Sequence, residues 1–131
     1  FENKLDIKEL SSSEVTVLTS RPTFLQKKNS QGYGWVVEDK NNFEILCKEK
    51  VTITSNNFFI ILGYFYFQKK SDFLNWYDFI RKNKIYINNE LYIDVLVREL
   101  VSSKLTVSNK IVDSHIVGTP EEYMNYINKD E

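Results

Sequence analysis

Hydrophobic and polar positions in the first half of the chain follow the short period of β-strands. Residues 14–19 are rich in β-branched side chains and alternate, and residues 34–38 and 43–47 flank a polar loop. This spacing predicts a strand over 14–19 and a hairpin whose loop is residues 39–42. Before them, the apolar residues between Leu5 and Leu10 are compatible with a short helical turn.

The run from Phe58 to Phe67 is apolar at nearly every position, with Gly63 inside it. A continuous apolar pattern indicates a strand that is covered on both faces, in the middle of a sheet with helices packed on it. A glycine within such a strand predicts a β-bulge or a close approach of another group to the backbone, and a local packing kink is the simpler alternative.

The second half of the chain changes to helical spacing. One helix is predicted with Ser71 as its N-cap, and another with Asn88 or Asn89 as its N-cap. The residues expected on the inner sides of these two helices are Phe73, Trp76, Tyr77, Ile80, Ile93, Leu96, Val97, Leu100 and Val101.

A further strand over 110–117 and a last helix complete the expected order of elements. Thr119 as N-cap, Pro120 at the first helical position and Glu122 form the pattern of a capping box. Tyr123, Tyr126 and Ile127 are expected to form the apolar side of that helix. Strands followed by strand–helix alternation indicate the α/β class, a mixed sheet flanked by helices, with residues 1–131 as a single domain piece.

Composition narrows the classes of partner. The chain has 17 Lys and Arg against 18 Asp and Glu, so it has no bulk charge that would attract nucleic acid or an anionic membrane. The longest apolar run is too short for a membrane helix. Cys47 is the single cysteine and cannot form an internal disulfide, which favours a reducing, cytoplasmic location.

Common catalytic and metal motifs are missing from the sequence. It has no glycine-rich phosphate loop and no Cys/His cluster with zinc-ligand spacing, so no metal ligand is assigned. His115 has no Ser or Cys partner at a motif spacing and is interpreted as structural. Gly32-Tyr33-Gly34 is interpreted as loop flexibility at the start of a strand.

Five short motifs occur in collinear order between roughly Glu14 and Ile127. Together they indicate a protein family more specifically than any one of them does alone. The sequence resembles the sugar nucleotidyltransferases, also called NDP-sugar pyrophosphorylases. The matching segments are Tyr33-Gly34-Trp35-Val36 with Asp39, Glu49-Lys50, Gly63-Tyr64-Phe65-Tyr66-Phe67 followed by Ser71-Asp72-Phe73-Leu74, Asn88-Asn89-Glu90-Leu91-Tyr92-Ile93-Asp94, and Val117-Gly118-Thr119-Pro120-Glu121-Glu122-Tyr123.

The resemblance implies a Rossmann-like domain that joins a sugar 1-phosphate to a nucleoside triphosphate and releases pyrophosphate, here for polysaccharide biosynthesis. It implies that Lys50 is catalytic and neutralises the sugar phosphate, and that Glu49 accepts hydrogen bonds from sugar hydroxyls. It also implies that the Gly63 backbone lies against the sugar ring, where a side chain would clash, and that Glu90 is a further sugar ligand.

Two departures from the family pattern limit this expectation. The glycine-rich part that holds the triphosphate and the Asp that usually binds Mg²⁺ are absent, and Ile116 occupies the position of a second metal-binding Asp. The chain is therefore interpreted as the C-terminal, sugar-binding part of such an enzyme, inactive alone, with Mg²⁺ and the nucleotide bound only in the complete protein.

Two other functions remain as alternatives. One is a non-catalytic module that binds a sugar phosphate or assembles with another chain. The other is a glycosyltransferase, which is disfavoured because the sequence has no Asp-x-Asp motif. An exposed edge of the sheet would also favour self-association.

Overall fold

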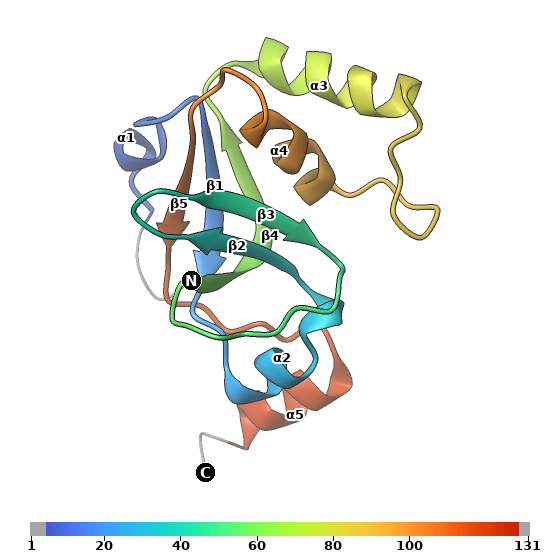
Figure 1. Cartoon of the computed structure of the whole chain (residues 1–131). Coiled ribbons are helices and arrows are strands. Elements are labelled where there is room, and N and C mark those ends of the chain that lie inside the picture. Colours follow the sequence, from blue (N-terminus) through green and yellow to red (C-terminus); the bar gives the residue numbers. More distant parts are fainter. Residues whose placement is uncertain (1–4, 129–131) are drawn as a thin grey trace.

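A five-stranded mixed sheet forms the centre of the computed structural model, which describes residues 5–128 (Figure 1). The strand order is β3-β2-β4-β1-β5; β1 and β5 are parallel, and the other neighbouring pairs are antiparallel. The expected α/β class with a mixed sheet and flanking helices is confirmed. The strands are β1 (Val15–Ser20), β2 (Gly34–Glu38), β3 (Phe43–Cys47), β4 (Phe58–Phe67) and β5 (Val107–Ile111).

β4 is the middle strand of the sheet, as its apolar run predicts. The expectation that both of its faces are covered is wrong for part of its length. Phe59 and Ile60 are buried, whereas Gly63 and Tyr64 are exposed. The exposed part of β4 is also the part that β2 does not reach, because β2 pairs with β4 only at Phe58–Ile60 and then diverges from it.

The bulge predicted from Gly63 is confirmed. Val17 of β1 pairs with Phe65, and Thr19 pairs with Ile61, so Leu18 alone lies opposite residues 62–64 of β4. Gly63 has a φ of +79°, a conformation that glycine adopts without the steric cost that a side chain brings.

Helices lie at two ends of the sheet. α3 and α4 lie together near one end, and α2 and α5 lie at the opposite end (Figure 1). The helices are α1 (Ile7–Leu10), α2 (Phe24–Lys28), α3 (Lys70–Lys82), α4 (Ile93–Val101) and α5 (Pro120–Ile127), and a 3₁₀-helix covers Ser30–Gly32. The turn over Leu5–Leu10 is thus present as α1, whereas α2 and the 3₁₀-helix were not predicted.

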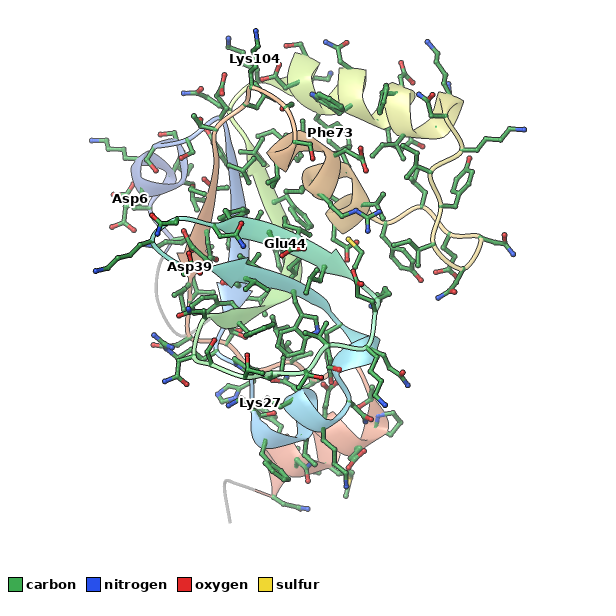
Figure 2. All side chains as sticks on the ribbon, viewed as in Figure 1. Asp6, Lys27, Asp39, Glu44, Phe73 and Lys104 are labelled. Carbon is green, nitrogen blue, oxygen red and sulfur yellow. The ribbon has the colours of Figure 1, made fainter. Side chains whose placement is uncertain are left out.

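The hydrophobic core lies between the sheet and the pair α3 and α4. Every residue of β1 is buried, and α4 contributes the largest share of any helix. Phe73 of α3 points into the space between α3 and α4 (Figure 2). The core cluster consists of Val15, Val17, Val36, Ile45, Cys47, Phe59, Ile80, Val95, Leu96, Val97 and Leu100.

Two of the predicted N-caps are wrong. α3 begins at Lys70 with Lys69 as its N-cap, so Ser71 lies within the helix. α4 has Tyr92 as its N-cap. Asn88 and Asn89 instead have positive φ values of 51° and 62°, and the residues on either side of them exchange both backbone hydrogen bonds. Two consecutive positive φ values define a tight hairpin turn, in which asparagine is tolerated because its side chain bonds locally.

The last strand begins and ends earlier than the predicted range 110–117. β5 pairs with β1 from Val15↔Val107 to Thr19↔Ile111, and β1 ends at Ser20, so a longer β5 would have no partner there. The capping box at Thr119 and Glu122 is confirmed. The side of α5 that carries Tyr123, Tyr126 and Ile127 is exposed, and no residue of this helix is buried.

Within residues 5–128, no helix is both long enough and apolar enough to cross a membrane.

Candidate functional site

A cleft of about 340 Å³ lies beside the bulge of β4 and is also lined by the segment leading into α4. It combines apolar walls with one carboxylate and one ammonium group, which is the composition expected of a small-molecule site. Four parts of the chain form it: the start of β2, the residue after β3, the bulged half of β4, and the segment that leads into the first turn of α4. The lining residues are Gly34, Lys48, Ile61, Gly63, Phe65, Leu91, Tyr92, Ile93 and Asp94.

Asp94 supplies the carboxylate of the cleft from the first turn of α4. Its residue surface is only 8% exposed. Burial raises the pKa of this carboxyl group, while the backbone N–H groups of Asp94 and Val95 and the charges of Lys48 and Arg98 counteract part of that rise. A carboxylate held in this environment is a strong acceptor for a ligand hydroxyl, and perturbed groups of this kind are concentrated at functional sites.

Gly34 allows the Asp94 carboxylate to approach the sheet. A Cβ atom on Gly34 would lie 2.5 Å from Asp94 Oδ2 and 3.2 Å from Ile61 Cδ1. Any side chain at this position would therefore displace the carboxylate. The sequence-based interpretation of Gly34 as loop flexibility missed this role. The rule that drew attention to Gly63, a glycine within a strand, applies equally to Gly34 at the start of β2.

Lys48 brings the ammonium group of the cleft. It follows β3 directly and has a φ of +51°, which turns the chain away from the strand direction. Its Nζ donates a hydrogen bond of 2.9 Å to the Gly32 carbonyl and lies 5.4 Å from the centre of the Tyr92 ring. These contacts hold a positive charge close enough to Asp94 to favour the ionised form of its carboxyl group.

Glu90 is not among the lining residues of the cleft, but it is hydrogen-bonded to Tyr92, which is. The Tyr92 hydroxyl donates a hydrogen bond to the Glu90 carboxylate, and this bond is the main reason that the pKa of Tyr92 is raised. The Asn88-Asn89 turn directly precedes Glu90 and pairs it with Ile87.

The residues that the resemblance implicates occupy different places. Gly63 lines the cleft, and no atom lies within 4 Å of the position its Cβ would take, so the space in front of its backbone is open. Glu49 and Lys50 lie just past the end of β3, exposed and outside the lining residues. Lys48, Tyr92 and Asp94 were not predicted, although they lie within or next to the motif segments.

A second and larger cavity of about 470 Å³ lies between α2 and α5 and shares no lining residue with this cleft. Arg21, Gln26 and His115 are among its lining residues, together with Ile116. His115 also contacts the Tyr126 ring at 5.1 Å between ring centres, in keeping with a structural role.

The described residues do not fit a complete magnesium site. Residues 5–128 contain no group of three or more His, Cys, Asp or Glu side chains placed to hold a metal ion. Ile116, at the position of the second metal-binding Asp in the resemblance, offers no side-chain oxygen as a ligand. The part of the chain that the structure describes therefore does not by itself supply the Mg²⁺ ligands that the resemblance implies.

Comparisons with known proteins give a structural relative only. No protein-family model matches the sequence, and no curated protein matches it. A solved structure, the nucleoside-diphosphate-sugar pyrophosphorylase from Vibrio cholerae RC9, is similar with a TM-score of 0.68 and 18% sequence identity. The match covers 96% of this chain and 50% of that protein, so the chain spans about half its length. The chain thus has a nucleotidyltransferase-like mixed α/β fold.

Proposed function

We propose that this chain forms the sugar-phosphate side of the active site of a sugar-1-phosphate nucleotidyltransferase. The observation that carries the proposal is the cleft beside the Gly63 bulge. In a fold shared with an NDP-sugar pyrophosphorylase, it holds the Asp94 carboxylate and the Lys48 ammonium together, and Glu49 and Lys50 follow Lys48 directly.

Nucleotidyl transfer to a sugar 1-phosphate requires few groups beyond these carboxylates and ammonium groups on the sugar side of the active site. Phosphoryl-type transfer depends on positioning and on neutralising negative charge. In the proposal, Lys50 neutralises the phosphate, while Glu49 and Glu90 accept hydrogen bonds from sugar hydroxyls. The open backbone of Gly63 leaves room for the sugar ring. Asp94 is a further acceptor, and the charge of Lys48 favours the ionised form of Asp94 against the effect of burial.

The complete protein would supply the rest of the site. We propose that this sequence is the C-terminal part of the enzyme, and that an N-terminal part binds the nucleoside triphosphate and Mg²⁺. The product would be an activated sugar for polysaccharide biosynthesis in the cytoplasm. The 131-residue chain alone is then expected to release no pyrophosphate from any nucleoside triphosphate with sugar 1-phosphate and Mg²⁺. Such release would contradict the proposal.

Lys50→Ala in the complete protein tests the catalytic role. Loss of the ammonium is expected to lower kcat/KM for sugar 1-phosphate by about 100-fold, the order seen when one charge-stabilising group is removed. Lys40→Ala, an equally exposed lysine in the β2–β3 loop, is the control and should leave turnover unchanged. Turnover that is unaffected by Lys50→Ala would remove Lys50 from the mechanism.

Ile116 favours a second candidate function, a module that binds a sugar phosphate without catalysis. Under this reading, the 131-residue chain binds sugar 1-phosphate equally well with and without Mg²⁺. Calorimetric titration with a panel of sugar 1-phosphates, in the presence of Mg²⁺ or of a chelator, separates the two functions. Turnover by the complete protein that requires Mg²⁺ would exclude the module.

A further inference from the structure

The cavity between α2 and α5 is built by parts of the chain that the proposed function does not use. These two helices lie at the end of the sheet opposite α3 and α4 (Figure 1). The cavity has a volume of about 470 Å³ and shares no lining residue with the cleft beside Gly63. Small-molecule sites have volumes of roughly 300–1,000 Å³, so the cavity is large enough for a ligand of its own.

Arg21 brings a positive charge to this cavity. It follows β1 directly and lines the cavity, and its guanidinium carbon lies 5.6 Å from the centre of the Phe59 ring. A cation–π contact of this kind attracts the charge to the face of the ring and limits where the side chain lies. In the part of the chain that the structure describes, Arg21 forms no ion pair. Its fork of N–H groups is therefore available to an oxyanion of a ligand.

Glu122 is the acidic residue among those that line the cavity, and its carboxylate is already engaged. One of its oxygens accepts a hydrogen bond from the Tyr33 hydroxyl, and the other accepts from the Thr119 N–H at 3.0 Å. A carboxylate that is held through both oxygens is not free to turn toward Arg21. The charge that remains for a ligand is positive, which selects a negatively charged one.

Two buried side chains in the cavity wall have hydrogen-bonding groups to spare. Gln26 is buried; its Oε1 accepts from the Thr23 N–H at 2.8 Å, while its NH₂ group forms no hydrogen bond with the described residues. The Ser114 Oγ atom is buried and has no partner within residues 5–128. Both residues line the cavity. Because both groups can donate, they favour a ligand with acceptor oxygens, as Arg21 does.

Aromatic and aliphatic side chains form the rest of the cavity wall. Phe24 of α2 and Tyr126 of α5 are 80% and 41% exposed, and Leu25 and Ile116 add aliphatic surface. Exposed large apolar side chains around a concave surface commonly mark a site that a ligand covers. Aromatic side chains pack against flat rings in stacked or edge-to-face arrangements, so the walls fit a flat apolar body.

We propose that the cavity between α2 and α5 binds a small organic anion, in which a carboxylate or phosphate head is joined to a flat apolar body. Arg21 pairs with the charged oxygens of the head, and the Gln26 NH₂ group is a further donor to it. Phe24 and Tyr126 cover the apolar body. The proposal goes beyond the proposed function, because it holds whether or not the cleft beside Gly63 binds a sugar phosphate.

Titrations of the protein with benzoate and with phenyl phosphate, followed by residue-resolved NMR, test the proposal. Both probes carry a flat ring and an anionic head, and the one that binds more tightly identifies the preferred head. The amide signals of residues 20–26 and 114–116 should shift. Benzamide has the same ring without the charge and should bind at least about 10-fold more weakly, because it cannot form a charge-assisted hydrogen bond with Arg21. The signals of Gly34 and Gly63 report separately on the cleft.

Arg21→Gln removes the positive charge from the cavity. We expect it to weaken binding of the tighter anionic probe by at least about 10-fold and to leave benzamide binding unchanged. Lys27→Gln is the matched control, because Lys27 is an exposed cation of α2 that does not line the cavity. Both substituted side chains are exposed, and equal midpoints of urea unfolding verify that the variants remain folded.

Four results would overturn the proposal. In the first, neither anionic probe shifts the signals of residues 20–26 and 114–116, including the case in which phenyl phosphate shifts only those of Gly34 and Gly63. In the second, benzamide binds as tightly as the anions, so that apolar contact alone accounts for binding. In the third, Arg21→Gln leaves the affinity unchanged. In the fourth, Lys27→Gln weakens binding as much as Arg21→Gln, which would indicate a diffuse effect of charge.

Discussion

The carboxyl group of Asp94 is buried, and burial disfavours its ionised form. Its folded-state pKa is raised above the ordinary value of 3.8, chiefly by burial. Between these two pKa values the folded protein binds more protons than the unfolded chain, so stability is lost as pH rises through this window. We expect the stability of Asp94→Asn relative to the natural sequence to increase with pH across it, because the amide carries no charge to bury.

Urea unfolding at a series of pH values measures this difference. Asp113→Asn is a suitable control because Asp113 is exposed. A pH-independent difference between Asp94→Asn and the natural sequence would show that the Asp94 carboxyl group titrates normally in the folded protein.

Gly34 is the residue at which the close contact in the cleft can be tested. In Gly34→Ala the new methyl group would lie 2.5 Å from Asp94 Oδ2, so the carboxylate must turn away. We expect a loss of about 1–3 kcal/mol in the free energy of unfolding, as for other overpacked sites. Gly32→Ala is the matched control, because no atom lies within 4 Å of its Cβ position. Equal stability of the two variants would contradict the contact.

The site could be predicted from the sequence only where a local rule applies. Gly63 was found because a glycine within an apolar strand predicts a bulge. Asp94 and Lys48 were missed because their meeting depends on non-local geometry. It requires the turn at Lys48, with its positive φ, and the departure of β2 from β4 at Gly34, neither of which has a periodic signal in the sequence.

α5 is the element with the least support from packing. None of its residues is buried, and its capping box joins Thr119 and Glu122. The Tyr33 hydroxyl donates to the Glu122 carboxylate and so links the helix to the rest of the chain; burial and this bond raise the pKa of Tyr33 to about 12. Helix stability in proteins comes mainly from a buried face. Because α5 has no buried residue, its cap contributes a larger share of its stability than in a packed helix.

Thr119→Ala should therefore unfold α5 locally. Loss of the cap costs about 1 kcal/mol, and without a buried face the helix has little to compensate for it. We expect faster amide exchange over residues 120–127, while the midpoint of urea unfolding, which reports the core, stays unchanged. Thr119→Ser keeps the hydroxyl and is the control. A fall in the unfolding midpoint would show that α5 belongs to the cooperative core.

Helices and strands could be predicted from the sequence where the pattern that defines them lies within one short segment. The β2–β3 hairpin and β4 have the predicted bounds because alternation, a polar loop and an apolar run each lie within one segment. β5 was displaced because its extent is set by its pairing with β1, more than 90 residues earlier in the chain. α2 carries a recognisable signal in the capping box of Thr23 and Gln26, which the periodicity of apolar residues does not reveal.

At the scale of the whole molecule, the reactivity of Cys47 can be used to measure how often the sheet and α4 separate from each other. It is the single cysteine, it lies in the core cluster at the end of β3, and it pairs with Gly34 at the cleft. Burial, followed by the charge of Asp94, raises the pKa of its thiol to about 12. Since the thiolate is the reactive form, the folded protein should protect Cys47 from alkylation both sterically and electrostatically.

Alkylation of Cys47 in mildly alkaline buffer should thus proceed through unfolding. Unfolded fractions of about 10⁻³ to 10⁻⁶ predict labelling slower than that of the urea-denatured chain by a similar factor. The rate should rise with urea as steeply as the free energy of unfolding falls, because the same surface is exposed in both processes. β3 is an edge strand, however, and its local detachment would give a different result: rapid labelling with little dependence on urea. That outcome would mean that the hairpin opens independently of the core, and that the Gly34–Asp94 contact is made and broken in the folded protein.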